Sequence, residues 1–219
     1  APSQPSSGHT TAGPSPRPPR PTPRRPDVQA GPGPLVVPER GTGQLRTVAD
    51  ADTSPGSASP ASDAVRYVLQ VEEGLPFNPK AVAALVDYVL DDERGWISAG
   101  HSLARTDELD EAEMHVIVAS PALTDELCAP LDTGGRLSCR NGSNVVLNGW
   151  RWANGAPSYA TKGLRAYRQY VTNHEVGHAL GYPHELCPEP GALAPVMMQQ
   201  TKGLGGCRAN PWPSRSDTP

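Results

Sequence analysis

The chain has 219 residues, including 26 prolines and four cysteines, and its formal net charge is −4 at pH 7. Residues 1–40 contain five arginines and two acidic residues, a net charge of +3, so the remaining residues carry −7. An acidic folded part argues against a nucleic acid as partner, and no stretch of the sequence is long and apolar enough to span a membrane.

The N-terminal 40 residues are predicted to form a disordered stalk. The tract PSPRPPRPTPRRP, from Pro14 to Pro26, has no apolar periodicity and cannot contribute to a core. Its positive charge allows contact with an anionic cell wall or membrane surface, and the alternative is a solvated spacer without a partner. We expect one folded domain over residues 41–213 and a flexible tail over residues 214–219.

A strand and a helix are the first elements expected in the folded part. The stretch VRYVLQVEE, which begins at Val65, alternates apolar and polar residues and predicts a half-buried strand. Asn78 followed by Pro79 is typical of a helix N-cap and first turn. Apolar residues then recur at helical spacing, and we expect Gly95 to end this run.

Two further strands and a long helix are expected in the second half. Residues 114–120 (MHVIVAS) and 144–148 (NVVLN) are short apolar runs, which are typical of buried strands. A helix from about Leu164 carries an apolar stripe at spacings of three and four residues, and His174 and His178 continue that stripe. The stripe predicts that this helix is buried.

Other aromatic and histidine residues have less specific interpretations. Trp150, Trp152 and Tyr159 precede the long helix and could line a substrate cleft, although such residues more often anchor a loop to the core. His101 and His115 have no partners at metal-ligand spacing, so we expect them to pack at the surface or in the sheet.

The four cysteines are Cys128, Cys139, Cys187 and Cys207, and none forms a CxxC pair that would suggest a second metal site. They allow three disulfide connectivities, and we expect sequence neighbours to pair as Cys128–Cys139 and Cys187–Cys207. The alternative is four buried free thiols in a cytosolic protein. The Pro/Arg-rich stalk favours an exported protein, in which disulfides persist, and a signal or anchor segment is expected upstream of Ala1.

The stretch HEVGHALGYPHE, from His174 to Glu185, holds three of the six histidines of the chain. Residues four apart lie on the same face of a helix, so His174 and His178 can direct two imidazoles at one point. Glu175 can approach that point from the side. An isolated HExxH motif is also compatible with an ordinary helix face.

The third histidine, His184, can reach the same point only if the helix ends and the chain turns back. Gly181 adopts a left-handed conformation at the least cost, and Pro183 prevents the helix from continuing. Three protein ligands with an open fourth position are the layout of a catalytic zinc site. The spacing therefore predicts Zn²⁺ bound by His174, His178 and His184, with Gly181 in the turn that ends the helix.

The pattern HExxHxxGxxH resembles the signature of the metzincin metallopeptidases. In that group a methionine turn lies beneath the three histidines, and APVMMQQ, with Met197 and Met198, follows here at the corresponding place. A Val or Leu usually precedes the turn methionine, so Met197, which follows Val196, is the better match and Met198 is the alternative. The methionine pair could also simply fill core space.

A closer resemblance covers roughly residues 41–213. The stretches HEVGHALG, APVMMQQTKGL and NPWP are similar to a family of exported actinobacterial proteins that is known only as a domain of unknown function. That family resembles the metzincins in its zinc motif. The resemblance supports a metallopeptidase without naming a substrate.

The metzincin resemblance implies an α+β fold of the zincin type, with a small twisted mixed sheet, two main helices and a short C-terminal part. We expect a monomeric, extracellular or surface-tethered zinc endopeptidase that acts on a protein or peptide substrate. Zinc-activated water would hydrolyse the peptide bond, with Glu175 as general base. The alternative function is a zinc-stabilised extracellular module that binds a partner without catalysis.

Overall fold

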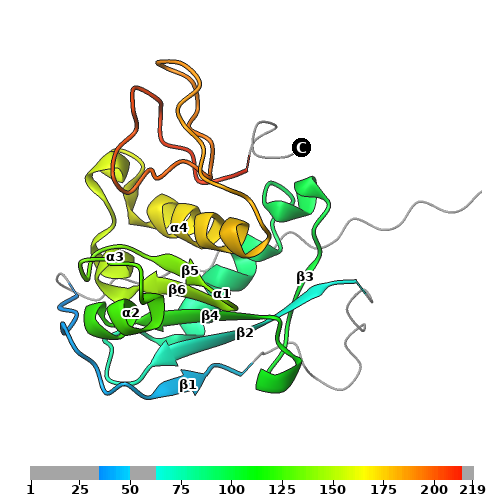
Figure 1. Cartoon of the computed structure of the whole chain (residues 1–219), viewed down its shortest axis with the longest axis vertical. Coiled ribbons are helices and arrows are strands. Elements are labelled where there is room, and N and C mark those ends of the chain that lie inside the picture. The colour runs from blue at the N-terminus through cyan, green and yellow to red at the C-terminus, as the bar shows by residue number, and fades with distance from the viewer. Residues whose placement is uncertain (1–34, 50–62, 214–219) are drawn as a thin grey trace, which may run out of the picture.

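The structure is a computed structural model that describes residues 35–49 and 63–213 (Figure 1). Its strands are β1 (Leu45–Thr47), β2 (Val65–Glu72), β3 (Leu103–Arg105), β4 (Met114–Ala119), β5 (Cys139–Asn141) and β6 (Asn144–Asn148). Its α-helices are α1 (Pro79–Leu90), α2 (Pro121–Cys128), α3 (Gly149–Asn154) and α4 (Gly163–Ala179). Short 3₁₀ helices are η1 (Trp96–Ala99), η2 (Leu109–Glu111) and η3 (Pro157–Tyr159).

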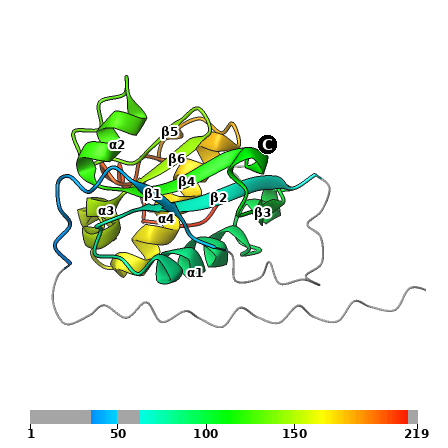
Figure 2. The ribbon, with the colours of Figure 1, turned by 90° about the horizontal axis from the view of Figure 1, so that it is seen from below.

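The strands form one mixed sheet in the spatial order β1-β2-β4-β6-β5. The central strands β2, β4 and β6 are parallel, and β1 and β5 run antiparallel at the two edges. β3 pairs in parallel with the beginning of β2, whereas β1 pairs with its end. The helices α1 and α4 cover one face of the sheet, and α2 lies against the other (Figures 1 and 2). The expected α+β fold with a mixed sheet is confirmed in this coarse form.

Helix α1 begins where the sequence predicts and ends earlier. The side chain of Asn78 accepts hydrogen bonds from two backbone N–H groups of the first turn, and Pro79 is the first helical residue. The helix stops at Leu90, whereas Gly95 was expected to end it and instead precedes η1. The residues between them, DDER, are polar and have no apolar face to bury against the sheet, so the helix does not continue through them.

The strand β2 was predicted to be half-buried, and this part of the prediction is wrong. All residues from Tyr67 to Glu72 are buried, including Val68 and Gln70 on the face away from α1. β2 lies inside the sheet, between β4 on one side and β1 and β3 on the other. Alternating polarity predicts a strand, but the position of that strand within the sheet decides how much of it is covered.

The strands β4 and β6 and the helix α4 also lie where they were predicted, whereas β1, β3, β5, α2 and α3 were not predicted. Of the helices within the described ranges, none combines the length and hydrophobicity that crossing a bilayer requires. Most of the expected stalk, residues 1–34, and the expected tail, residues 214–219, lie outside the described residues.

Residues 35–40, which the sequence analysis assigned to the stalk, pack on the domain. Val37 is buried, and the carbonyl group of Glu39 accepts a hydrogen bond from the N–H of Ala122 at 2.9 Å. The carboxylate of Glu39 forms an ion pair with Arg136 at 2.6 Å. These six residues therefore belong structurally with the domain.

Candidate metal centre

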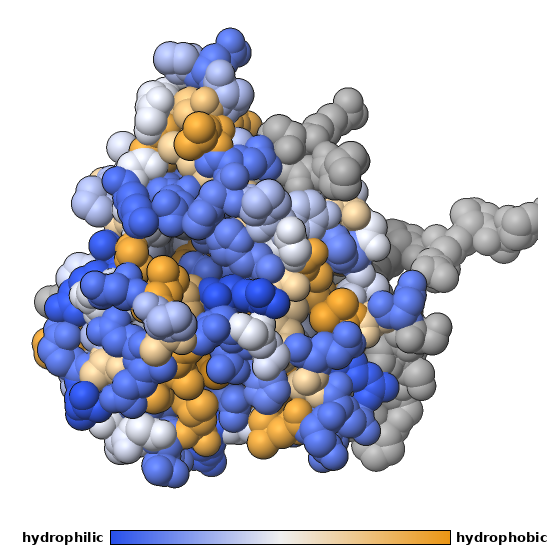
Figure 3. Space-filling model, viewed as in Figure 1, coloured by the Kyte–Doolittle hydropathy of each residue, from blue (hydrophilic) through white to orange (hydrophobic). Residues whose placement is uncertain are grey.

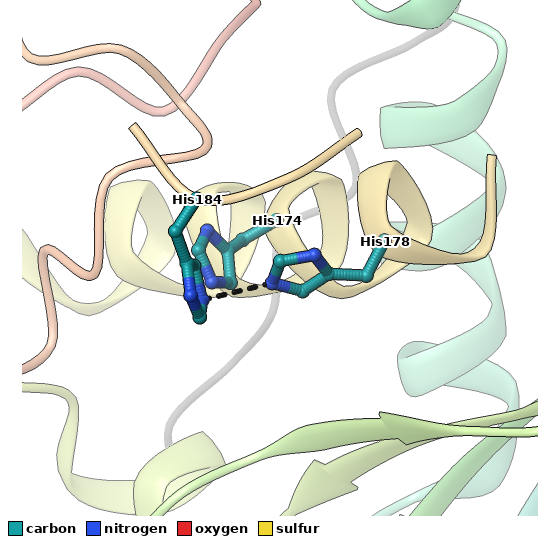
Figure 4. A group of neighbouring side chains, drawn as sticks. All are labelled: His174, His178 and His184. Carbon is teal, nitrogen blue, oxygen red and sulfur yellow. Dashed lines mark hydrogen bonds between the residues drawn. The ribbon is translucent and has the colours of Figure 1, made fainter. Parts of the chain in front are cut away.

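Three histidines converge beside α4. His174 and His178 project from the C-terminal half of the helix, and His184 approaches from the segment that follows it (Figure 4). Their ligand nitrogens lie within 4.8 Å of one another, and Nε2 of His178 is 3.0 Å from Nε2 of His184. The group could hold a metal ion, so the spacing in the sequence correctly predicts which histidines come together.

The turn after α4 brings His184 back to the helix. Gly181 has a φ of 97°, in the region that favours glycine. Its N–H bonds to the carbonyl group of His178 at 3.2 Å. The N–H of Tyr182 bonds to the carbonyl group of Gly177 at 2.9 Å. This pair of hydrogen bonds is a Schellman motif, which ends the helix at the glycine that the sequence predicts.

Backbone carbonyl groups fix the tautomer of both helical histidines. Nδ1 of His174 lies 2.8 Å from the carbonyl oxygen of Val196. Nδ1 of His178 lies 2.9 Å from the carbonyl oxygen of Tyr182. Because a carbonyl oxygen only accepts, each Nδ1 carries the hydrogen and each Nε2 presents a lone pair. Histidines that bind metals are commonly oriented in this way.

The side chain of Met197 lies against α4 at Gly177. In the sequence, Gly177 stands between the two helical histidines, His174 and His178. A Cβ atom on Gly177 would lie 2.5 Å from Sδ of Met197 and closer still to the ring of Trp96. Both of those side chains are fully buried. Met198 packs in a separate small cluster. Of the two candidates for the methionine turn, Met197 is therefore the one whose side chain lies against the helix at Gly177, whereas Met198 meets the helix through its carbonyl group, which accepts a hydrogen bond from Tyr170.

An aromatic cluster that the sequence analysis missed holds the turn in place. Tyr182 stacks on Trp96 with ring centroids 4.5 Å apart, and its hydroxyl group lies 2.9 Å from Nε2 of His101. Trp96 donates from Nε1 to the carbonyl group of Asn173 at 3.0 Å. Because Tyr182 also supplies the carbonyl group that orients His178, the cluster connects η1 to the histidines.

Glu175 follows His174 in the helix and lines the cavity in front of the triad. It is only 5% exposed, and no residue in the described ranges donates a hydrogen bond to its carboxyl group. Burial raises the pKa of Glu175 to about 8. A buried carboxyl group without a hydrogen-bond donor is costly to maintain, and such groups are concentrated at functional sites.

Burial keeps the three histidines neutral at pH 7. It lowers the pKa of His174 to about 3, although the hydrogen bond to a backbone carbonyl group opposes the shift. It also lowers the pKa of His178, where a similar bond opposes the shift and the charge of Arg140 reinforces it. Burial lowers the pKa of His184 as well, with further contributions from His178 and Lys202. Neutral imidazole is the form that binds a metal ion.

The triad opens into a cavity of about 370 Å³. Its walls come from α4, from β5 with the segment before it, and from the loop after the methionines. Besides Glu175 and the three neutral histidines, the cavity is lined by three charged residues: Asp132, Arg140 and Lys202. Asp132 and Arg140 lie far from the histidine motif in the sequence and belong to no motif, and Lys202 lies in the stretch APVMMQQTKGL without a role that the sequence predicts. Figure 3 shows the face seen in Figure 1, where hydrophilic residues predominate around small hydrophobic groups.

Two disulfide bonds flank the site, and they have the pairing expected from the sequence. Cys128 is bonded to Cys139 and closes the segment between α2 and β5, which supplies one wall of the cavity. Cys187 is bonded to Cys207 and ties the segment that follows His184 to the C-terminal part. Disulfides of this kind indicate an oxidising environment.

Of the three aromatic residues before α4, two belong to the core and the third lies partly exposed between arginines. Trp152 and Tyr159 are buried, and the ring of Trp150 is flanked by Arg136 and Arg151. None of the three aromatic residues lines the cavity of the triad.

Comparison with known families places most of the chain in a described family. A family model described as "Protein of unknown function (DUF3152)" matches residues 31–211, which is most of the chain. No curated protein and no solved structure matches the sequence or the fold.

Proposed function

The chain belongs to the DUF3152 family of proteins of unknown function, and we propose that this member is a secreted or surface-tethered zinc-dependent endopeptidase. The observation that carries the proposal is the setting of Glu175. Its carboxyl group is buried, has no hydrogen-bond donor among the described residues, and faces a cavity beside three converging histidines.

The donor set fits zinc. Imidazole nitrogens bind Zn²⁺ at about 2.0–2.1 Å, which places two nitrogens of a tetrahedral site about 3.3 Å apart. The 3.0 Å separation between His178 and His184 is close to that value. His174 would complete the set, and three protein ligands leave a fourth position for water or substrate, as catalytic zinc requires.

Glu175 is suited to move a proton in both directions. When bound, zinc supplies a Lewis acid that polarises a carbonyl group and lowers the pKa of water. Glu175 would accept a proton from the attacking water and deliver it to the leaving amine. Burial raises the pKa of its carboxyl group to about 8, and a neighbouring cation favours the carboxylate form. Burial and a bound cation therefore shift the pKa of Glu175 in opposite directions.

Further features support the finer parts of the proposal. Two histidines on a helix, a third after the turn at Gly181, and Met197 against the helix are what a metzincin-like fold would provide. The two disulfides are compatible with export. Contact of the stalk with a cell wall or membrane surface remains a prediction from its charge.

The test is to measure zinc content and cleavage of a peptide library with the purified chain of residues 1–219. We expect one zinc ion per chain and cleavage that falls at least about 100-fold in Glu175→Gln, because the general base is lost. Glu73→Gln, which changes an exposed carboxylate outside the cavity, serves as the matched control. Cleavage that survives Glu175→Gln with zinc bound would exclude the proposed base.

Chelation distinguishes the peptidase from a non-catalytic zinc module. Treatment with EDTA should abolish cleavage and lower the melting temperature, and added zinc should restore both. At a free zinc concentration 100 times Kd, binding stabilises the folded state by about 2.7 kcal/mol. A chain that loses thermal stability on chelation but cleaves no peptide in the library would favour the non-catalytic module.

A further inference from the structure

The cavity of the triad is lined by two cations, Arg140 and Lys202, that form no ion pair with a carboxylate of the described residues. Arg140 lies on the edge strand β5, and its guanidinium group forms no ion pair or hydrogen bond with the described residues. Lys202 lies on the loop after the methionines and donates a hydrogen bond to Oε1 of Gln199 at 3.3 Å. Arg140 is near enough to His178, and Lys202 to His184, to act on them electrostatically.

These cations contrast with the charge of the rest of the domain. The chain beyond residue 40 carries a net charge of −7. Elsewhere among the described residues, five of the arginines form ion pairs: Arg40–Glu126, Arg66–Glu111, Arg94–Asp92, Arg105–Asp87 and Arg136–Glu39. Positive charge left uncompensated in the cavity of an acidic domain attracts an anionic ligand.

The acidic residues of the cavity do not compensate the two cations. Oδ1 of Asp132 accepts the N–H of Gly134 at 2.9 Å, and Asp132 forms no ion pair with Arg140 or Lys202. Glu175 is a buried residue of α4, and its carboxyl group has no salt-bridge partner within the described residues. The two cations are therefore available to a ligand that enters the cavity.

We propose that Arg140 and Lys202 bind a carboxylate of the substrate, so that the scissile peptide bond lies within one or two residues of an acidic group. This inference rests on the proposed peptidase function and names its substrate class. The carboxylate could belong to an aspartate or glutamate side chain, or to the free C-terminus of a short peptide. Leu131 and Leu137 also line the cavity and offer an apolar surface to the neighbouring part of the peptide.

Cleavage of matched peptides tests the inference. Three peptides with blocked ends differ only in carrying Glu, Gln or Lys beside the scissile bond, and a fourth is the Gln peptide with a free C-terminus. We expect the Glu peptide to be cleaved at least about fivefold faster than the blocked Gln peptide, and the Lys peptide slowest. Faster cleavage of the fourth peptide instead would identify the C-terminal carboxylate as the group that is bound.

The variants Arg140→Gln and Lys202→Gln should each reduce the preference for the acidic peptide by about twofold, and the double variant should abolish it. Arg46→Gln and Lys80→Gln remove exposed positive charges that lie outside the cavity and should leave the preference unchanged. The double charge reversal Arg140→Glu, Lys202→Glu should favour the Lys peptide. A preference for the acidic peptide that persists in the double reversal would overturn the inference.

A binding measurement separates failure of this inference from failure of the proposed function. The zinc-loaded Glu175→Gln variant is titrated with the blocked Glu and Gln peptides, each carrying the same neutral fluorophore, at low and high salt. Tighter binding of the Glu peptide, weakened by salt and lost in Arg140→Gln, Lys202→Gln, supports the carboxylate site even if the parent cleaves nothing. Equal binding, together with equal cleavage of all peptides by the parent, would overturn the site and leave the peptidase standing.

Discussion

Gly177 occupies a position that no other residue can fill without displacing its neighbours. It lies between the two helical histidines, and the missing side chain allows Met197 and Trp96 to contact the helix directly. Both side chains are fully buried and have little freedom to move aside. The position of the histidines relative to the rest of the site therefore depends on a glycine that is not part of the ligand pattern.

The variant Gly177→Ala should be less stable than the parent. Alanine favours a helix over glycine by about 1 kcal/mol, but overpacking against Met197 and Trp96 costs about 1–3 kcal/mol. We expect a lower midpoint of urea unfolding, measured in EDTA so that metal binding does not contribute. Gly181→Ala is the comparison, because nothing lies near a Cβ there and only the φ of 97° opposes the change. A midpoint for Gly177→Ala above that of the parent would contradict the close contact of Gly177 with Met197 and Trp96.

Among the elements, the turn after α4 is supported by η1 through Tyr182. Replacement of Tyr182 by Ala removes the stack on Trp96 and loosens the carbonyl group that orients His178. We expect zinc affinity to fall by about tenfold, as for other groups that orient a metal ligand. Competition with a chelating dye measures the affinity. Tyr182→Phe keeps the stack and loses only the contact with His101, so its effect should be smaller. Equal affinity of the Ala variant and the parent would show that the cluster does not support the site.

The disulfide Cys187–Cys207 joins the segment after the third ligand to the C-terminal part, and it closes a loop whose ends are 20 residues apart. A disulfide that closes a loop of this length stabilises the folded state by about 3 kcal/mol, because it restricts the unfolded chain. We expect the double variant Cys187→Ser, Cys207→Ser to bind zinc about tenfold more weakly, while β2 and β4 keep their protection from hydrogen exchange. The matched control is Cys128→Ser, Cys139→Ser, which should keep the zinc affinity. Parent-like affinity in the first variant would refute a role of this disulfide in the site.

For the whole molecule, the N-terminal boundary of the domain can be tested by truncation. Deletion of residues 1–34 should leave the melting temperature unchanged, because their composition predicts no contribution to a core. Deletion of residues 1–40 also removes buried Val37 and the hydrogen bond from Ala122 to Glu39. These two contributions amount to about 2 kcal/mol, which lowers the melting temperature by about 4–8 °C. Calorimetry of both truncated chains decides between a boundary near residue 35 and one near residue 41.

The predicted elements are those that carry a pattern of their own. The helices α1 and α4 have apolar residues at helical spacing, and β2, β4 and β6 are apolar or alternating runs of at least five residues. The strands β1, β3 and β5 have three residues each, which is too short for a periodic signal, and they exist because they pair with β2 or β6. The helix α3 has only six residues, so it too is short for a periodic signal.

The sequence by itself determined which histidines form the triad, since the pattern that brings them together lies within twelve residues. The helical period places His174 and His178 on one face, and a glycine turn returns His184 to them. Only the tertiary structure decided what surrounds the triad. His101 meets Tyr182 across 81 residues of chain, and Arg140 reaches the cavity because β5 pairs with β6. Contacts of this kind arise from packing of the sheet against its helices, and no local pattern in the sequence records them.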